Sequence, residues 1–157
     1  MSFKTTDLCD EHPLAGTLPT AFLDFGGEVS FEGEVLTVKC FEDNSRIKEL
    51  SQTAGQGRVL VVDGGASQRC ALLGDIIAED LVRHGWAGIV VNGCIRDRAA
   101  LAQLDLGVKA LGSHPRKSNK HAEGQVGNPV EIGGVRIETG HYLYADEDGI
   151  VVLPAKV

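Results

Sequence analysis

The chain has 157 residues, of which 43% are hydrophobic and 24% are charged, and its formal net charge at pH 7 is -7. This composition is ordinary for a globular domain long enough to bury a core. The acidic balance argues against nonspecific nucleic-acid binding, which needs a basic surface. The sequence shows no secretory leader and no apolar run of the roughly 20 residues that a membrane span needs. We therefore expect a cytoplasmic protein that contacts neither membrane nor nucleic acid directly.

The four cysteines are Cys9, Cys40, Cys70 and Cys94, and no two of them form a C-x-x-C pair. Cys40 and Cys94 stand in apolar, strand-like contexts. We expect free, largely buried thiols in a reducing compartment and neither disulfides nor zinc ligands.

In chain order, the first half of the sequence predicts a helix or turn over residues 7–15, a strand over 33–41, a helix over 44–53 and a strand over 58–63. Asn44 or Ser45 is the expected cap of the second helix, because short polar side chains accept hydrogen bonds from its first free N–H groups. The strand over 58–63 is apolar and ends at Gly64-Gly65, which indicates that it is buried.

The centre of the chain predicts one helix and one strand that lie between two polar pairs. The apolar residues at helical spacing are Leu72, Leu73, Ile76, Ile77, Leu81 and Val82. Gly74-Asp75 opens this helix, and Gly85 is its stop signal. Residues 88–91 are short, apolar and β-branched, which predicts a buried strand. Arg96-Asp97 therefore lies just past the carboxyl end of a strand.

The remainder predicts a short helix over 98–104, a strand over 107–111, a polar loop over 113–128, and two hairpins over 130–138 and 142–153. The first hairpin turns at Gly133-Gly134 and the second at Asp148-Gly149. Alternating α and β units in the middle, with mainly β structure at the ends, indicate an α/β domain in which sheets pack on each other.

Gly74-Asp75 and Arg96-Asp97 lie where open α/β proteins bind ligands. A helix N-terminus offers free N–H groups to an anion, an arginine offers a planar fork to a carboxylate, and two carboxylates suit a hard metal ion. Ordinary structural roles remain open from spacing alone. Asp97 is then the cap of the following helix, Arg96 a surface ion-pair partner, and Asp75 a first-turn acid near the helix dipole.

Asp75, the twenty-residue gap and the Arg96-Asp97 pair resemble the RraA-like family, which includes class II 4-hydroxy-4-methyl-2-oxoglutarate aldolases and regulators of ribonuclease E activity. The similarity extends along the chain through residues 7–10, 25–27, 38–44, 59–65, 71–75, 93–97 and 143–149. The resemblance implies a single domain over residues 1–157 with the swivelling β/β/α fold, assembled as a homotrimer.

The same resemblance implies roles for individual residues. Asp97 falls on the family's metal-binding aspartate, which would hold Mg²⁺ or Mn²⁺ directly, and Asp75 would contact the metal through water. Arg96 would bind the substrate's carboxylate and keto oxygen and stabilise developing negative charge. Gly74, Ile76 and Ile77 would offer backbone N–H groups to the pyruvyl carboxylate.

The implied activity is cleavage of a small 2-oxo-dicarboxylate through a pyruvate enolate. The substrate would be 4-hydroxy-4-methyl-2-oxoglutarate, or oxaloacetate in a decarboxylation. In the aldolase pattern an acid stands where this chain has Ala100, and aldolase members tend to extend beyond the position of Val157. Decarboxylation is therefore the activity that we expect to persist. The alternative is a non-catalytic protein inhibitor that binds ribonuclease E.

Three other features of the sequence are weaker candidates for a functional site. Residues 61–65 superficially suggest a nucleotide-binding loop, but they lack the G-x-G-x-x-G spacing and the Walker lysine, which also argues against a methyltransferase. Lys39 is the one candidate for a Schiff base and is a poor one. Arg69 is either a further anion contact or an ordinary exposed arginine.

Overall fold

The computed structural model describes residues 2–157 and contains four helices, α1 (Thr5–Glu11), α2 (Ser45–Ser51), α3 (Asp75–Arg83) and α4 (Arg98–Leu101). The strands are β1 (Gly16–Thr17), β2 (Leu23–Asp24), β3 (Phe31–Lys39), β4 (Val59–Asp63), β5 (Ala71–Leu73), β6 (Gly88–Ile95), β7 (Gly107–Ser113), β8 (Gln125–Val126), β9 (Val130–Ile132), β10 (Val135–Ile137), β11 (Tyr142–Asp146) and β12 (Gly149–Leu153). A ten-stranded sheet has the order β1-β12-β11-β3-β4-β6-β7-β2, with β5 beside β6 and β8 beside β3, and β9 and β10 form a separate hairpin.

Strand β3 joins two parts of the sheet. Its first residues pair antiparallel with β11, and residues 35–39 pair parallel with β4. The parallel set then continues through β6 and β7. The sheet therefore curls at β3, and the carboxyl ends of four parallel strands meet at one edge, where ligands bind in open α/β sheets.

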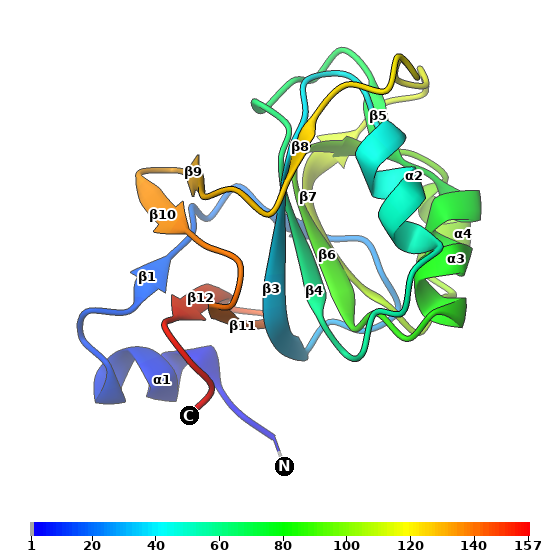
Figure 1. Cartoon of the computed structure of the whole chain (residues 1–157). Helices are drawn as coiled ribbons and strands as arrows, with labels where there is room; N and C mark the ends of the chain where they lie inside the picture. Colours follow the sequence, from blue (N-terminus) through cyan, green and yellow to red (C-terminus); the bar gives the residue numbers. More distant parts are fainter. Residues whose placement is uncertain (1) are drawn as a thin grey trace.

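Both faces of the parallel strands are covered, which explains why β4 is an unbroken apolar run. Leu60 and Val62 point toward α2, α3 and α4, which lie together on one face (Figure 1). Val59 and Val61 point to the opposite face and pack against the β9–β10 hairpin and β11–β12. The period-2 alternation of a strand thus serves two hydrophobic cores.

A third, smaller core anchors α1. Leu8 packs with Tyr144, Val151 and Leu153 of the last hairpin. The Thr5 backbone N–H and hydroxyl donate to the two carboxylate oxygens of Asp146, at 2.8 and 2.6 Å. The N-terminal helix and the C-terminal hairpin therefore form one unit, and both chain ends lie on this side of the molecule (Figure 1).

Most of the expected elements are confirmed, including both hairpins and the strands at β3, β4, β6 and β7. The prediction that Leu72 and Leu73 belong to a helix is wrong, because residues 71–73 form β5 beside β6. The helices α2 and α4 end earlier than expected, and the predicted loop contains β8. All four cysteines are free thiols, and three are buried. No helix within residues 2–157 is long and apolar enough to cross a membrane.

Candidate active site

Strand β5 brings the two polar pairs of the candidate site together. Leu73 pairs with Ile95 at the end of β6, and the Arg96 N–H continues the ladder by donating to the Leu73 carbonyl at 2.9 Å. Gly74-Asp75 therefore stands directly beside Arg96-Asp97. Short strand pairing, and not a continuous helix, creates the contact between these two segments.

Asp97 does not cap the helix that follows it. Its backbone occupies the N-cap position of α4 in the left-handed conformation, with φ 61° and ψ 46°, and its side chain makes no capping bond there. Instead, Asp97 Oδ2 accepts the Asp75 backbone N–H at 3.0 Å, at the start of α3. Left-handed aspartates are uncommon, and such conformations concentrate at functional sites. The capping alternative for Asp97 is therefore wrong.

Gly74 permits this close approach. A Cβ atom at position 74 would lie 2.9 Å from Asp97 Oδ2 and 3.4 Å from Arg96 Nε. The first distance is shorter than side-chain carbons tolerate, so any larger residue would displace Asp97. The sequence suggested only a backbone N–H donor at Gly74, whereas the structure gives it a steric role as well.

A cavity of about 190 Å³ opens over these residues, at the carboxyl edge of the parallel strands. Gly74, Asp75, Ile76, Ile77, Arg96 and Asp97 all line it. Every predicted site residue thus belongs to one cavity. Its volume is below the range of about 300–1,000 Å³ that drug-sized ligands occupy, so a small ligand fits best.

The sequence interpretation missed one wall of this cavity, which Asn44, Lys48, Lys117 and Lys120 form. Asn44 is buried, donates from Nδ2 to the Leu72 carbonyl at 3.2 Å and accepts Lys120 Nζ at 3.0 Å. Burial lowers the pKa of Lys120, and the positive charges of Lys48, Lys117 and Arg96 lower it further, with Asp43 acting in the opposite direction. The only signal in the sequence was the basic character of the loop.

Arg69 and Lys39, which the sequence offered as weaker candidates, do not line this cavity. Arg69 is bound to Glu42 through Nε and Nη2 at 2.7 and 2.8 Å, so it is not a contact in this cavity. Lys39 is exposed and lines a different hollow with Phe41 and Asp63. The buried lysine is Lys109, whose Nζ is held by the Asp146 carbonyl and the Asp24 carboxylate.

The side chains at the cavity could hold a metal ion only if water supplied most of its ligands. Within residues 2–157, no group of three or more histidine, cysteine, aspartate or glutamate side chains is placed to hold a metal. Asp97 is exposed and Asp75 half-buried, and both line the cavity. One carboxylate with water in the other positions is a common arrangement for Mg²⁺. These residues fit a hydrated Mg²⁺ or Mn²⁺ and not a fully enclosed metal site.

Comparison with known proteins decides the family. The sequence profile of the RraA-like family, described as Aldolase/RraA, matches residues 5–152. The chain belongs to the RraA-like family. A protein of Pseudomonas fluorescens (strain Pf0-1), provisionally named a 4-hydroxy-4-methyl-2-oxoglutarate aldolase, is 52% identical over 98% of this chain and 94% of its own length.

Two solved structures match almost the whole chain at 43% identity. The RNA-processing inhibitor RraA from Thermus thermophilis superimposes with a TM-score of 0.97, covering 100% of this chain and 96% of that one. A protein from Geobacillus kaustophilus HTA426, named S-adenosylmethionine: 2-dimethylmenaquinone methyltransferase, superimposes with a TM-score of 0.96 and covers 99% of this chain and 97% of its own chain. These matches confirm the predicted RraA-like α/β fold. The names of the relatives describe three different functions, so the activity has to be argued from the site.

Proposed function

We propose that this protein is a divalent-metal-dependent carbon–carbon lyase that forms pyruvate from small 2-oxo-dicarboxylates. The observation that carries the proposal is the juxtaposition of Arg96 and Asp97 with the first turn of α3 in one small cavity. The aldolase name of relatives at about 52% identity supports a lyase. The preponderance of cationic side chains around the cavity, on a chain of net charge -7, supports an anionic substrate.

The proposed chemistry places negative charge where the site offers positive charge and N–H groups. The backbone N–H groups of Ile76 and Ile77 lie in the first turn of α3, where a helix leaves its amides free for an anion such as the 2-oxo acid's carboxylate. The Arg96 guanidinium binds the keto oxygen and stabilises the enolate as it forms. Asp97 would hold the metal, with Asp75 acting through water, and the bound metal would supply Lewis-acid polarisation of the keto group.

Two substrates lead to the same pyruvate enolate. In 4-hydroxy-4-methyl-2-oxoglutarate the C3–C4 bond breaks, its electrons form the enolate, the C4 hydroxyl loses its proton, and protonation at C3 gives a second pyruvate. In oxaloacetate the C3–C4 bond breaks with loss of CO₂, and no base is needed at a distal hydroxyl. Because Ala100 stands where the aldolase pattern has an acid, we propose oxaloacetate decarboxylation as the more robust of the two activities.

The test is pyruvate release from each substrate with Mg²⁺ and with EDTA. We expect release above the rate of Mg²⁺ alone, loss of release with EDTA, and a ratio of kcat/KM values that favours oxaloacetate. Release equal to the metal-only background with both substrates would reject the lyase proposal.

The second candidate function is inhibition of ribonuclease E by direct protein binding. It is favoured by the TM-score of 0.97 with a protein titled an RNA-processing inhibitor and by the acidic surface, which suits a basic, RNA-binding partner. Such binding would weaken as salt rises. Asp97→Ala would leave it intact while removing catalysis, so the two functions separate in one variant.

We do not propose methyl transfer for this chain. Residues 61–65 after β4 lack the glycine spacing of a nucleotide-binding loop. The cavity of about 190 Å³ is also small for a nucleoside cofactor.

A further inference from the structure

Three lysines form one wall of the candidate cavity, and the proposed chemistry at Arg96 and Asp97 does not use them. Lys48 comes from α2, whereas Lys117 and Lys120 come from the segment after β7. We call these three side chains the lysine wall. All three line a cavity that Arg96 also lines, on a protein with net charge -7. Asp75 and Asp97 line the same cavity and offset part of the repulsion, but cationic side chains still outnumber these carboxylates, so a bound anion would lower the remaining repulsion.

The position of Lys120 within the wall is fixed by a buried amide. Asn44 is 6% exposed, and its Nδ2 donates to Leu72 in β5, which orients its Oδ1 toward Lys120 Nζ at 3.0 Å. The same strand, β5, leads directly into Gly74, which also lines the cavity. One backbone segment therefore positions both Gly74 and, through Asn44, Lys120.

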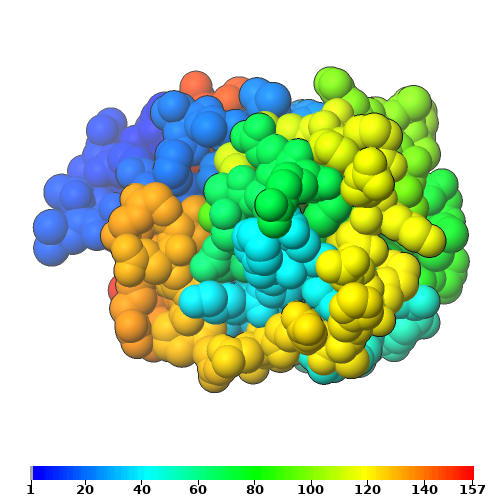
Figure 2. Space-filling model, turned by 90° about the horizontal axis from the view of Figure 1, so that it is seen from above, coloured from blue at the N-terminus to red at the C-terminus, as the bar shows by residue number. Residues whose placement is uncertain are grey.

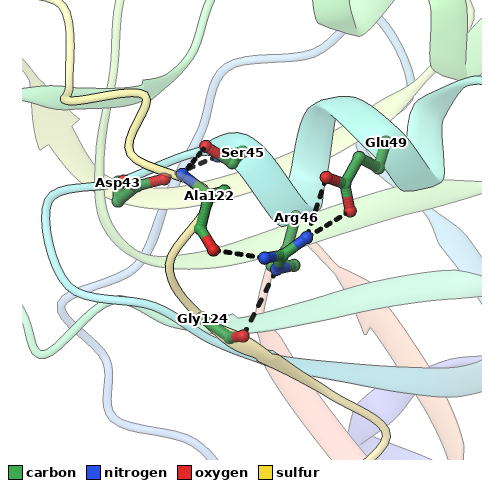
Figure 3. Close-up of polar contacts among 6 residues, drawn as sticks. All are labelled: Asp43, Ser45, Arg46, Glu49, Ala122 and Gly124. Carbon is green, nitrogen blue, oxygen red and sulfur yellow. Dashed lines mark hydrogen bonds and ion pairs between the residues drawn. The ribbon is translucent and has the colours of Figure 1, made fainter.

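The segment that carries Lys117 and Lys120 is fastened to the start of α2. Asp43 Oδ2 accepts the His121 N–H at 2.6 Å, and Ser45 Oγ accepts the Ala122 N–H at 3.0 Å. Arg46 donates to the carbonyls of Ala122 and Gly124 and also binds Glu49 (Figure 3). We call this set of contacts the α2–loop clamp. Seen from above, residues 113–128 lie against the start of α2 (Figure 2).

The clamp holds an irregular backbone and not a regular element. Ala122 has φ 56° and Gly124 has φ 119°, both in the region that side chains disfavour. Asp43 is 1% exposed. Burial would raise its pKa, but hydrogen bonds from Ser45, His121 and Glu123 outweigh burial and lower it, so the carboxylate stays charged and keeps its donors. A loop fixed in this way presents its lysines in a defined place.

We propose that the lysine wall binds the second carboxylate of the substrate, and that the α2–loop clamp positions the wall so that the cavity selects acids with two carboxylates over acids with one. This inference rests on the proposed function, which places the first carboxylate at the first turn of α3 and the keto oxygen at Arg96. It adds the residues that discriminate among 2-oxo acids. The pKa of Lys120 is lowered first by burial and then by the neighbouring cations, and a bound anion would relieve the second of these effects.

Binding of two inert 2-oxo acids tests the proposal without turnover. 2-Oxoglutarate has two carboxylates and 2-oxobutyrate has one, and neither is a β-keto acid or carries a 4-hydroxyl group. With Mg²⁺ present, calorimetry of the full chain should give about tenfold tighter binding of 2-oxoglutarate, the effect of one good charge-assisted contact. The double variant Lys117→Met/Lys120→Met should remove that advantage and change the Kd of 2-oxobutyrate by less than about twofold.

Lys156→Met is the control for loss of a positive charge outside the cavity, because Lys156 lies beside Tyr142, on the side of the two termini. It should leave both Kd values unchanged. The inference would be overturned if the double variant weakened the binding of both acids equally, or if its preference for 2-oxoglutarate were unchanged. Absence of binding of either acid to the wild type would overturn it too. Pyruvate release is measured separately, so failure of the lyase proposal is seen in a different experiment.

Arg46→Met tests the clamp, since Arg46 contacts the loop but does not line the cavity. We expect about threefold weaker binding of 2-oxoglutarate, unchanged binding of 2-oxobutyrate, and partial recovery in Arg46→Lys. In turnover of oxaloacetate the same variant should raise KM and leave kcat nearly unchanged. A fall in kcat at constant KM would show that the clamp does not act through the lysine wall.

Discussion

Asp97 and Asp146 are two carboxylates that stand at strand ends and accept backbone N–H groups, yet they differ in almost every other respect. Asp146 is buried and receives the N–H and hydroxyl of Thr5 and the N–H of Asp148. Asp97 is exposed, has the single bond from Asp75, and holds its backbone in the left-handed region.

The two carboxylates therefore differ in role: Asp146 stabilises the fold, whereas Asp97 is free to bind a ligand. Asp146 has its hydrogen-bonding capacity filled by the protein itself, which links α1 to the last hairpin. Asp97 retains free capacity at the mouth of a cavity, in a backbone conformation that costs stability. An unfavourable backbone conformation that brings no structural benefit is expected at a functional site.

Asp97→Asn should produce the largest change in activity and almost none in stability. Asparagine still accepts the Asp75 N–H and tolerates the left-handed region, but it removes the negative charge proposed to hold the metal. We expect kcat/KM for pyruvate release to fall about 10³-fold. The free energy of unfolding, measured by urea titration, should change by less than about 0.5 kcal/mol. A large loss of stability would assign Asp97 a structural role.

Asp146→Asn should show the reverse pattern. It leaves the Thr5 donors without a charged acceptor in a buried place, which should lower the free energy of unfolding by about 3 kcal/mol. Below the unfolding temperature, kcat/KM should stay within about twofold of wild type. Loss of activity in the folded variant would break the comparison.

Acid titration sharpens the role of Asp146. Burial opposes ionisation, but the hydrogen bonds from Thr5, Asp148 and Gly149 outweigh it, so the folded pKa of Asp146 is below its ordinary value. Its contribution is therefore complete above the unfolded pKa of about 3.9 and is lost as pH falls through that value toward the folded pKa. Between about pH 5 and about pH 3, the wild type should lose stability more steeply than Asp146→Asn.

Gly74→Ala should have an intermediate effect on activity. The added Cβ would stand 2.9 Å from Asp97 Oδ2 and force that carboxylate to shift. Since small displacements of catalytic groups cost about 10²-fold or less, we expect a smaller loss of kcat/KM than in Asp97→Asn. Gly112→Ala is the control at the same sheet edge, because its Cβ would meet only Cys94 Sγ at an ordinary 3.9 Å.

Arg69→Gln should have the smallest effect. Arg69 is highly exposed and pairs with Glu42 outside the cavity. Exposed ion pairs contribute about 0–1 kcal/mol, so the free energy of unfolding should change by that amount or less. The value of kcat/KM should not change. A clear rise in KM would restore Arg69 as an anion contact.

The sequence predicted the elements whose signals are local and missed those set by distant partners. The apolar run of β4 and the glycine turn of the β9–β10 hairpin were recognisable from neighbouring residues alone. Leu72-Leu73 fits a helix by spacing, and only its pairing with residues 94–95 makes it a strand.

The candidate site shows the same limit. Arg96, Asp97 and Gly74-Asp75 were found because they follow a recognisable motif. Lys120 joins the cavity through Asn44, which is 76 positions away in sequence, and no local pattern announces that contact. Spacing also favoured a capping role for Asp97, because the left-handed conformation that aims its side chain at α3 depends on the packing of β5 against β6.

Exchange of the methyl protons of pyruvate for deuterium tests the central claim most directly. Water removes a methyl proton, the enolate that forms is stabilised at Arg96 and Asp97, and the solvent returns a deuteron to the methyl carbon, so the exchange does not depend on the natural substrate. Proton NMR in D₂O with Mg²⁺ should show exchange that EDTA removes, that Asp97→Asn removes, and that Asp146→Asn retains. Exchange no faster than that of Mg²⁺ alone, or exchange that persists in Asp97→Asn, would contradict the account.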